Sequence, residues 1–149
     1  MVTPIEQRYI DLHPKSGQLY ATSKDIFPNG VTHDGRNLKP FPLFATHAQS
    51  SHKWDVDGNR IIDYWTGHGS LILGHCHPDV VASVTEQMSR GTHFSASTEL
   101  ELKWAQLVKE LIPCAEKVRF HSSGTEATMM ALRMARAYTS KSKVIKFKN

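Results

Sequence analysis

The chain has 149 residues, of which 40% are hydrophobic and 21% charged, and its formal net charge is +4. These proportions are typical of a globular protein with one hydrophobic core, and they exclude a disordered or low-complexity chain. No apolar run is long enough to span a membrane, no signal-peptide pattern follows Met1, and the C-terminal lysines alternate with apolar residues. We therefore expect a cytoplasmic protein that binds neither a membrane nor nucleic acid, with Cys76 and Cys114 as free thiols.

The first part of the chain predicts helices followed by a small antiparallel sheet. A helical pattern covers residues 4–27, is broken near Pro14, and ends at the Pro28-Asn29-Gly30 cluster. After an irregular segment, short runs typical of strands follow at residues 43–48, 52–55 and 60–64. Asp57-Gly58-Asn59 predicts the turn between the second and third of these runs.

The second part predicts an α/β arrangement. A glycine-rich loop leads to a helix that starts at Pro78 and ends near Gly91, and Thr98-Glu99-Leu100-Glu101 has the spacing of a capping box before another helix. Predicted strands at 117–120 and 143–147 flank a predicted helix over 125–139. This order is a βαβ unit with parallel strands. Two strands do not form a stable parallel sheet alone, so we expect a truncated α/β domain.

The turn Ser122-Ser123-Gly124-Thr125 is the most informative segment. It joins a predicted strand to a predicted helix N-terminus, where unpaired N–H groups and the helix dipole favour an anion. A phosphate is the expected ligand, although small hydroxyl residues are also common as ordinary helix caps. The turn matches neither the P-loop nor the dinucleotide-binding pattern.

Ordered blocks of sequence between about Ile26 and Phe147 support one family. The sequence resembles the class III (fold type I) pyridoxal-phosphate aminotransferases, within them the glutamate-1-semialdehyde aminomutase-like branch. The blocks are Pro28–Val31, Trp54–Arg60, Leu71–His75 with His77-Pro78, Thr98–Glu101, Phe120–Ala127, and Arg133 with Ala135–Ala137 through Lys146-Phe147. The resemblance implies a small-domain part over residues 1–66 and the start of the large pyridoxal-phosphate domain over residues 67–149.

The resemblance also implies site residues. Ser123, Gly124 and Thr125 match the turn that holds the phosphate of pyridoxal 5'-phosphate (PLP). Arg36 falls where the aminomutase branch has an arginine that pairs with the substrate carboxylate, which suits a planar fork, although a solvated surface arginine is equally compatible with this position. His68 stands where many aminomutase-like sequences have an aromatic pocket residue. That departure favours a transaminase that acts on another amino acid.

Two other segments contain side chains with possible chemical roles, and we expect a structural role for both. His75-Cys76-His77 offers potential metal ligands, but no third ligand has recognisable spacing, and we expect a loop that enters a helix. Glu126 is expected to interact with the helix dipole instead of acting as an acid or base.

The family's chemistry needs a lysine that forms a Schiff base with PLP, and no lysine of this chain matches its position. We therefore expect the N-terminal fragment of a transaminase that is homodimeric at full length, without activity as 149 residues. An aminomutase that moves the amine within one substrate is the alternative. A non-catalytic product that acts as a dimerisation partner is an alternative of another class.

Overall fold

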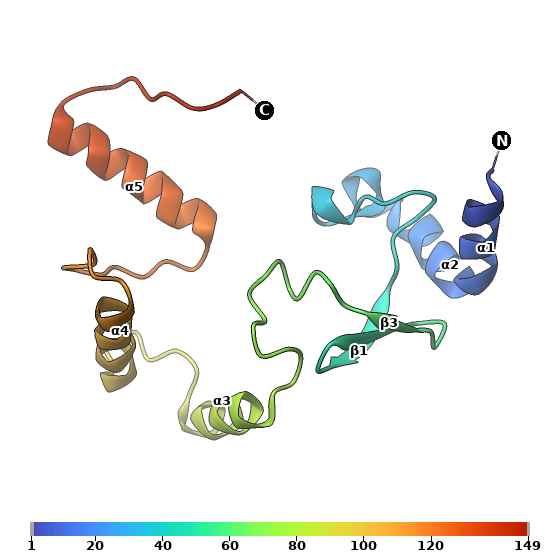
Figure 1. Cartoon of the computed structure of the whole chain (residues 1–149), viewed down its shortest axis with the longest axis horizontal. Coiled ribbons are helices and arrows are strands. Elements are labelled where there is room, and N and C mark those ends of the chain that lie inside the picture. Colours follow the sequence, from blue (N-terminus) through green and yellow to red (C-terminus); the bar gives the residue numbers. More distant parts are fainter. Residues whose placement is uncertain (1, 149) are drawn as a thin grey trace. The chain divides into compact units, whose positions relative to one another are not determined.

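The computed structural model describes residues 2–148 (Figure 1). The chain divides into two compact units, one that ends at Thr92 and one that begins at His93. The first contains two helices, the short 3₁₀ helices Pro28–Gly30 and Asp34–Arg36, a three-stranded sheet and a third helix, and the second contains two further helices.

Helices α1 (Pro4–Leu12) and α2 (Pro14–Ser23) confirm the predicted break near Pro14. Thr3 begins α1 with a complete capping box, because its hydroxyl oxygen accepts from the Glu6 N–H at 3.2 Å and its own N–H donates to the Glu6 carboxylate at 2.7 Å. Helix α2 has no side-chain cap from its own N-cap residue, His13. Its free N–H groups are therefore satisfied from elsewhere in the chain.

The three strands form an antiparallel sheet in the order β1-β2-β3. They are β1 (Ala45–Gln49), β2 (His52–Asp55) and β3 (Arg60–Ile62), so the predicted hairpin block is confirmed with slightly different ends. In the register, Trp54 lies opposite His47 on one side and Arg60 on the other. The Trp54 and His47 rings stack with their centroids 4.7 Å apart, which adds side-chain contact to this pairing.

The glycine-rich loop after β3 is attached to the sheet at His75, just before α3 (Pro78–Arg90). The N–H groups of Ser50 and His75 each donate to the other residue's carbonyl at 2.8 Å. Gly74 permits this approach, because it has φ +80° and a Cβ there would lie 2.8 Å from the Ser50 carbonyl oxygen. Both ends of the loop are therefore anchored on the sheet.

The second unit contains α4 (Glu99–Leu111) and α5 (Gly124–Thr139), as predicted. Thr98 caps α4 through its hydroxyl, which accepts from the Glu101 N–H at 3.4 Å and donates to the Glu101 carboxylate at 3.1 Å. The Trp104 and Phe120 rings stack 3.6 Å apart and connect α4 to the segment before α5.

The predicted strands over 117–120 and 143–147 are wrong for the described part of the second unit, where neither segment is a strand. A strand requires a hydrogen-bonded neighbour, and the parallel pairing of these segments would need a larger sheet and its covering helices. The helix between them ends at Thr139, its C-cap residue Ser140 has φ 55°, and the Arg136 Nε–H donates to the Ser142 carbonyl at 2.9 Å.

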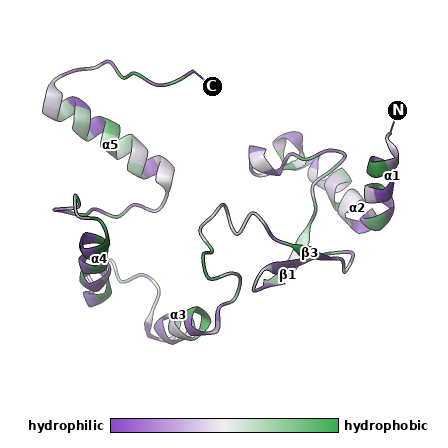
Figure 2. Cartoon of the chain, viewed as in Figure 1, coloured by the Kyte–Doolittle hydropathy of each residue, from purple (hydrophilic) through white to green (hydrophobic). Residues whose placement is uncertain are grey.

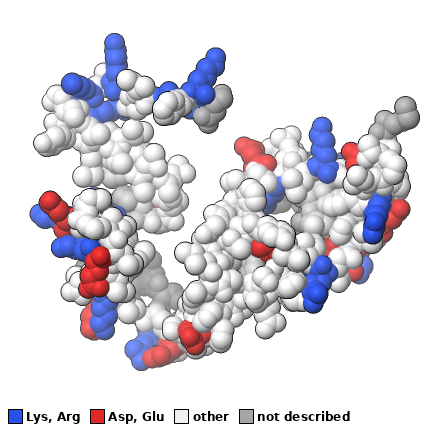
Figure 3. Space-filling view, viewed as in Figure 1, with Lys and Arg blue, Asp and Glu red and all other residues white. Residues whose placement is uncertain are grey.

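The apolar faces of the helices are exposed. Figure 2 shows apolar and polar sides on α3, α4 and α5, as the sequence pattern predicts. Apart from Pro42, no apolar side chain among residues 2–148 is buried, so the core faces expected on these helices are not covered within the described chain. Figure 3 shows acidic and basic side chains interspersed over the first unit. In the segment after α5, all charged residues are lysines.

Candidate functional site

The predicted phosphate turn lies at the N-terminus of α5. Ser123 is the N-cap residue, and its hydroxyl oxygen accepts a hydrogen bond from the Glu126 N–H at 3.2 Å. The Ser123 carbonyl accepts from the Ala127 N–H at 3.0 Å. The turn is thus a helix cap, and the Ser123 hydroxyl proton stays free to donate to an anion.

The geometry of this turn is suited to a phosphate. Among the described residues, no acceptor is hydrogen-bonded to the N–H of Gly124 or Thr125, the first two residues of α5. Gly124 is exposed, and a Cβ on it would meet no atom within 4 Å, so an anion can approach the backbone closely. Two N–H groups and a hydroxyl therefore converge where the helix dipole is positive.

A shallow hollow of about 570 Å³ runs from this turn along one side of α5. Gly124 and Thr125 lie at its start, and two arginines supply its positive charge. Its lining residues are Gly124, Thr125, Thr128, Met129, Leu132, Arg133 and Arg136.

Arg36 lies in the first unit, at the end of the 3₁₀ helix Asp34–Arg36. Its side chain is exposed, and one guanidinium nitrogen donates to the Thr32 hydroxyl at 3.0 Å. No carboxylate of the described residues pairs with it, and its remaining N–H groups are available for a bidentate contact.

His68 lies in a run of left-handed backbone. Thr66, Gly67, His68 and Gly69 all have positive φ, with His68 at 59°. Such a conformation is rare for residues other than glycine, and runs of this kind occur at ligand sites. The His68 ring packs edge-on against Trp65, with the centroids 5.4 Å apart.

The structure brings the segments of Arg36 and His68 together through a residue that the sequence did not single out. The His33 ring lies 5.3 Å from the His68 ring, and the Arg36 N–H donates to the His33 carbonyl at 2.9 Å. Trp65 and His33 were both missed as site residues. Their sequence neighbourhood carries no motif, because the contact arises only when two separate loops meet.

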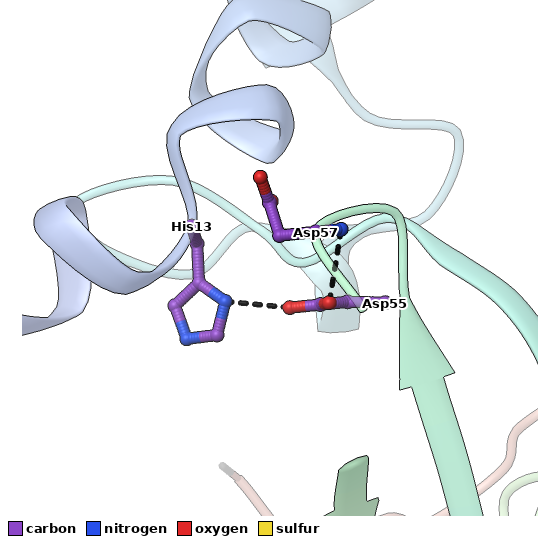
Figure 4. A group of neighbouring side chains, drawn as sticks. All are labelled: His13, Asp55 and Asp57. Carbon is purple, nitrogen blue, oxygen red and sulfur yellow. Dashed lines mark hydrogen bonds and ion pairs between the residues drawn. The ribbon is translucent and has the colours of Figure 1, made fainter. Parts of the chain in front are cut away.

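A second cluster consists of His13, Asp55 and Asp57 (Figure 4). Ligand atoms of these three residues lie within 4.8 Å of one another, which is compatible with a metal ion. Figure 4 shows the His13 ring pointing at Asp55, with His13 Nδ1 2.6 Å from the carboxylate. The other Asp55 oxygen accepts from the Asp57 N–H at 3.0 Å.

The hydrogen bonds of this cluster favour a structural role. The Asp57 carboxylate accepts from the N–H groups of Lys15 and Ser16 at 2.9 and 3.1 Å, and so caps α2. Asp55 also accepts from Asn59. Burial opposes ionisation of Asp55, but the hydrogen bonds from Asn59 and His13 outweigh it and lower the pKa of Asp55. These bonds occupy the oxygens that a cation would need.

The structure also gives His75 a structural role. Its Nε2 lies 2.7 Å from the buried Asp63 carboxylate, which accepts from the Lys53 ammonium at 3.1 Å and the Trp65 N–H at 3.0 Å. The hydrogen bond with His75 holds the pKa of Asp63 well below its ordinary range, against the effect of burial, with Lys53 and Trp65 adding to the shift. Asp63 and His75 therefore close the base of the loop that carries His68.

Comparison with known proteins identifies the fold as that of transaminases. A β-phenylalanine aminotransferase from Variovorax paradoxus matches with a TM-score of 0.88 and 30% identity, over 91% of this chain and 32% of that chain. A transaminase solved with PLP bound matches with a TM-score of 0.84 and 36% identity, over 87% of this chain and 31% of that one. A curated glutamate-1-semialdehyde 2,1-aminomutase from Methanopyrus kandleri is 45% identical over 93% of this chain and 32% of its own length.

The sequence profile of the class-III aminotransferases matches residues 34–149. The chain belongs to the class-III aminotransferase family, which confirms the predicted resemblance. It spans about a third of the length of the curated relatives that it matches. No helix of residues 2–148 has both the length and the apolarity needed to cross a membrane.

Proposed function

We propose that this chain supplies the phosphate site and one side of the substrate pocket of a PLP-dependent transaminase. The observation that carries the proposal is the Ser123–Thr125 turn, with its two free N–H groups, inside the segment that matches the class-III family. The related transaminase with PLP bound supports the choice of phosphate. When bound, PLP stabilises negative charge at the carbon that carries the amino group.

The roles of the chain's own residues follow from their chemistry. Ser123, Gly124 and Thr125 bind the phosphate through the hydroxyls and backbone N–H groups. Arg36 pairs with the substrate carboxylate, and His68 lines the pocket beside it. Glu126 contributes negative charge in the first turn of α5 and exchanges no proton with the substrate.

The proposal includes inactivity of the 149-residue chain by itself. None of its lysines matches the family position that bonds to the cofactor, and the chain spans about a third of its relatives. The division at residues 66 and 67, the cytoplasmic location and the homodimeric state at full length stay predictions from the sequence.

The phosphate site is tested by nuclear magnetic resonance on the ¹⁵N-labelled chain. PLP and inorganic phosphate are expected to shift the amide signals of Gly124 and Thr125, whereas pyridoxal, which lacks the phosphate, leaves them in place. Thr125→Val removes one hydroxyl donor and is expected to weaken phosphate binding about fivefold to tenfold. Thr139→Val, at the other end of α5, is the matched control. Equal responses to pyridoxal and PLP would contradict a phosphate site.

An aminomutase is the second candidate, and the 45% identity to a glutamate-1-semialdehyde 2,1-aminomutase favours it. His68 and the transaminase structures favour amino transfer between two substrates. Assays on a version that extends over the full length of the relatives separate these functions. A strict aminomutase needs no external keto acid, whereas a transaminase requires one.

The exposed apolar faces of α3, α4 and α5 are consistent with the candidate from another class, a non-catalytic dimerisation partner. Sedimentation analysis of the purified chain, alone and mixed with an intact class-III aminotransferase, tests this candidate. Stable association with the intact enzyme would support it, and sedimentation as a lone monomer in the mixture would oppose it.

A further inference from the structure

We propose that His33 is a positioning residue that holds Arg36 and His68 in a fixed arrangement relative to each other. This inference rests on the proposed function, which assigns Arg36 and His68 to the substrate pocket. His33 connects these two residues, which lie on separate loops of the first unit.

His33 first fixes the short helix that ends at Arg36. As its N-cap residue, His33 accepts the Gly35 N–H on Nδ1 at 3.1 Å and the Arg36 N–H on its carbonyl at 2.9 Å. A Cβ on Gly35 would lie 3.2 Å from His33 Nδ1, so glycine allows the ring to come this close. The backbone position of Arg36 thus depends on both the side chain and the main chain of His33.

His33 then contacts the His68 ring with its own imidazole ring. The two imidazoles pack edge-on, with centroids 5.3 Å apart and planes inclined by 60°. Trp65 holds the His68 ring from its own loop. The His68 ring is therefore fixed by one contact from each loop, and the His33 contact sets its position relative to Arg36.

The cap also fixes the tautomer of the neutral His33 ring. Nδ1 accepts a hydrogen bond only when it carries no proton, so the neutral ring carries its proton on Nε2. The charged groups beside it on its own helix are Asp34 and Arg36, and the titratable group that faces it from the other loop is His68. A smaller capping residue would satisfy Gly35 without reaching His68.

Two substitutions separate the two contacts. His33→Asn keeps a side-chain oxygen for the Gly35 N–H but removes the ring, whereas His33→Ala removes both. His33→Ala is expected to speed hydrogen exchange of the Gly35 amide about fivefold, the fold-change for loss of one cap. Both variants are expected to move the His68 ring signals. Asn37→Ala, at an exposed neighbouring position, is the control.

The experiment uses the full 149-residue chain, with glutarate as a carboxylate probe and the Arg36 Nε signal as the readout. Glutarate affinity is expected to fall about fivefold in His33→Ala and to recover largely in His33→Asn, a rescue that general loosening would not produce. A long-range ¹H–¹⁵N spectrum is expected to show the Nε2–H tautomer of His33.

Unchanged Gly35 exchange in His33→Ala, or unchanged His68 ring signals in both variants, would overturn the positioning role. An Nδ1–H tautomer would overturn it as well. If glutarate fails to shift Arg36 in the unmodified chain, the carboxylate role of Arg36 in the proposed function is wrong. The Gly35 and His68 signals then still decide whether His33 positions the two loops.

Discussion

Asp63→Asn should release the loop that carries His68. The Asp63 carboxylate accepts three hydrogen bonds, from Lys53, Trp65 and His75, and its side chain is almost fully buried. The asparagine has nearly the same shape but no charge. Its oxygen can replace the acceptor of Lys53 and Trp65, whereas its NH₂ group faces His75 Nε2, which must then accept a hydrogen bond. We expect the base of the loop, where His75 pairs with Ser50, to open more often.

The magnitude follows from the loss of charge. A hydrogen bond to a charged group contributes about 1.5–3 kcal/mol, and one between neutral groups about 0.5–1.5 kcal/mol. The substitution therefore costs about 1 kcal/mol per bond, reduced at Lys53 because its side chain is 32% exposed and screened by solvent. We expect a total of about 2 kcal/mol, or roughly 30-fold faster exchange.

Hydrogen exchange at the Ser50 and His75 amides measures this local opening, because these N–H groups form the bridge at the loop base. Asp79→Asn is the matched control. The Asp79 side chain is 92% exposed and lies 4.0 Å from His77, so less than about a twofold change is expected. Similar exchange rates in the two variants would refute the role assigned to Asp63.

The same reasoning sets the direction of the pH dependence. Because the pKa of Asp63 is lowered in the folded chain, its contribution is complete above the ordinary aspartate value of about 3.9 and is lost as pH falls below it. Exchange rates at His75, corrected for the intrinsic effect of pH, should rise in acid for the unmodified chain. Asp63→Asn should lack this component.

The remaining predictions concern caps and glycines. Asp57→Ala removes the cap of α2 and should lower the stability of that helix by about 1–2 kcal/mol, measured as exchange of the Ser16 amide; no change would contradict the capping role. Gly74→Ala should open the bridge to Ser50 because its Cβ meets a carbonyl oxygen at 2.8 Å, whereas Gly58→Ala has a similar positive φ and no atom within 4 Å. At either position, alanine at positive φ lowers the free energy of unfolding by about 1–2 kcal/mol. Thermal unfolding should therefore show a larger loss of stability for Gly74→Ala than for Gly58→Ala, and equal losses would rule out the close approach.

Local signals in the sequence were sufficient for the helices, the hairpin and the turn at Ser123. Proline, capping residues and the Asp57-Gly58-Asn59 turn act within a few residues, so their effect is readable without a fold. The contacts that organise the site are different. Asp57 caps a helix more than 40 residues earlier in the chain, and His33 meets His68 across two irregular loops. No periodicity or spacing encodes such approaches.

The apolar faces show where sequence patterning stops being informative. The spacing of Leu100, Trp104 and Leu107 predicts one apolar side of α4. All three residues lie on that helix and all three are exposed. The pattern specifies which side is apolar but not what covers it. The two incorrectly predicted strands have the same cause, because a β-leaning segment becomes a strand only when a neighbour supplies its hydrogen bonds. The turn at Ser123 differs from the apolar faces and from the strands, because a helix N-terminus presents its N–H groups without a distant partner. The local sequence is therefore sufficient to predict this turn.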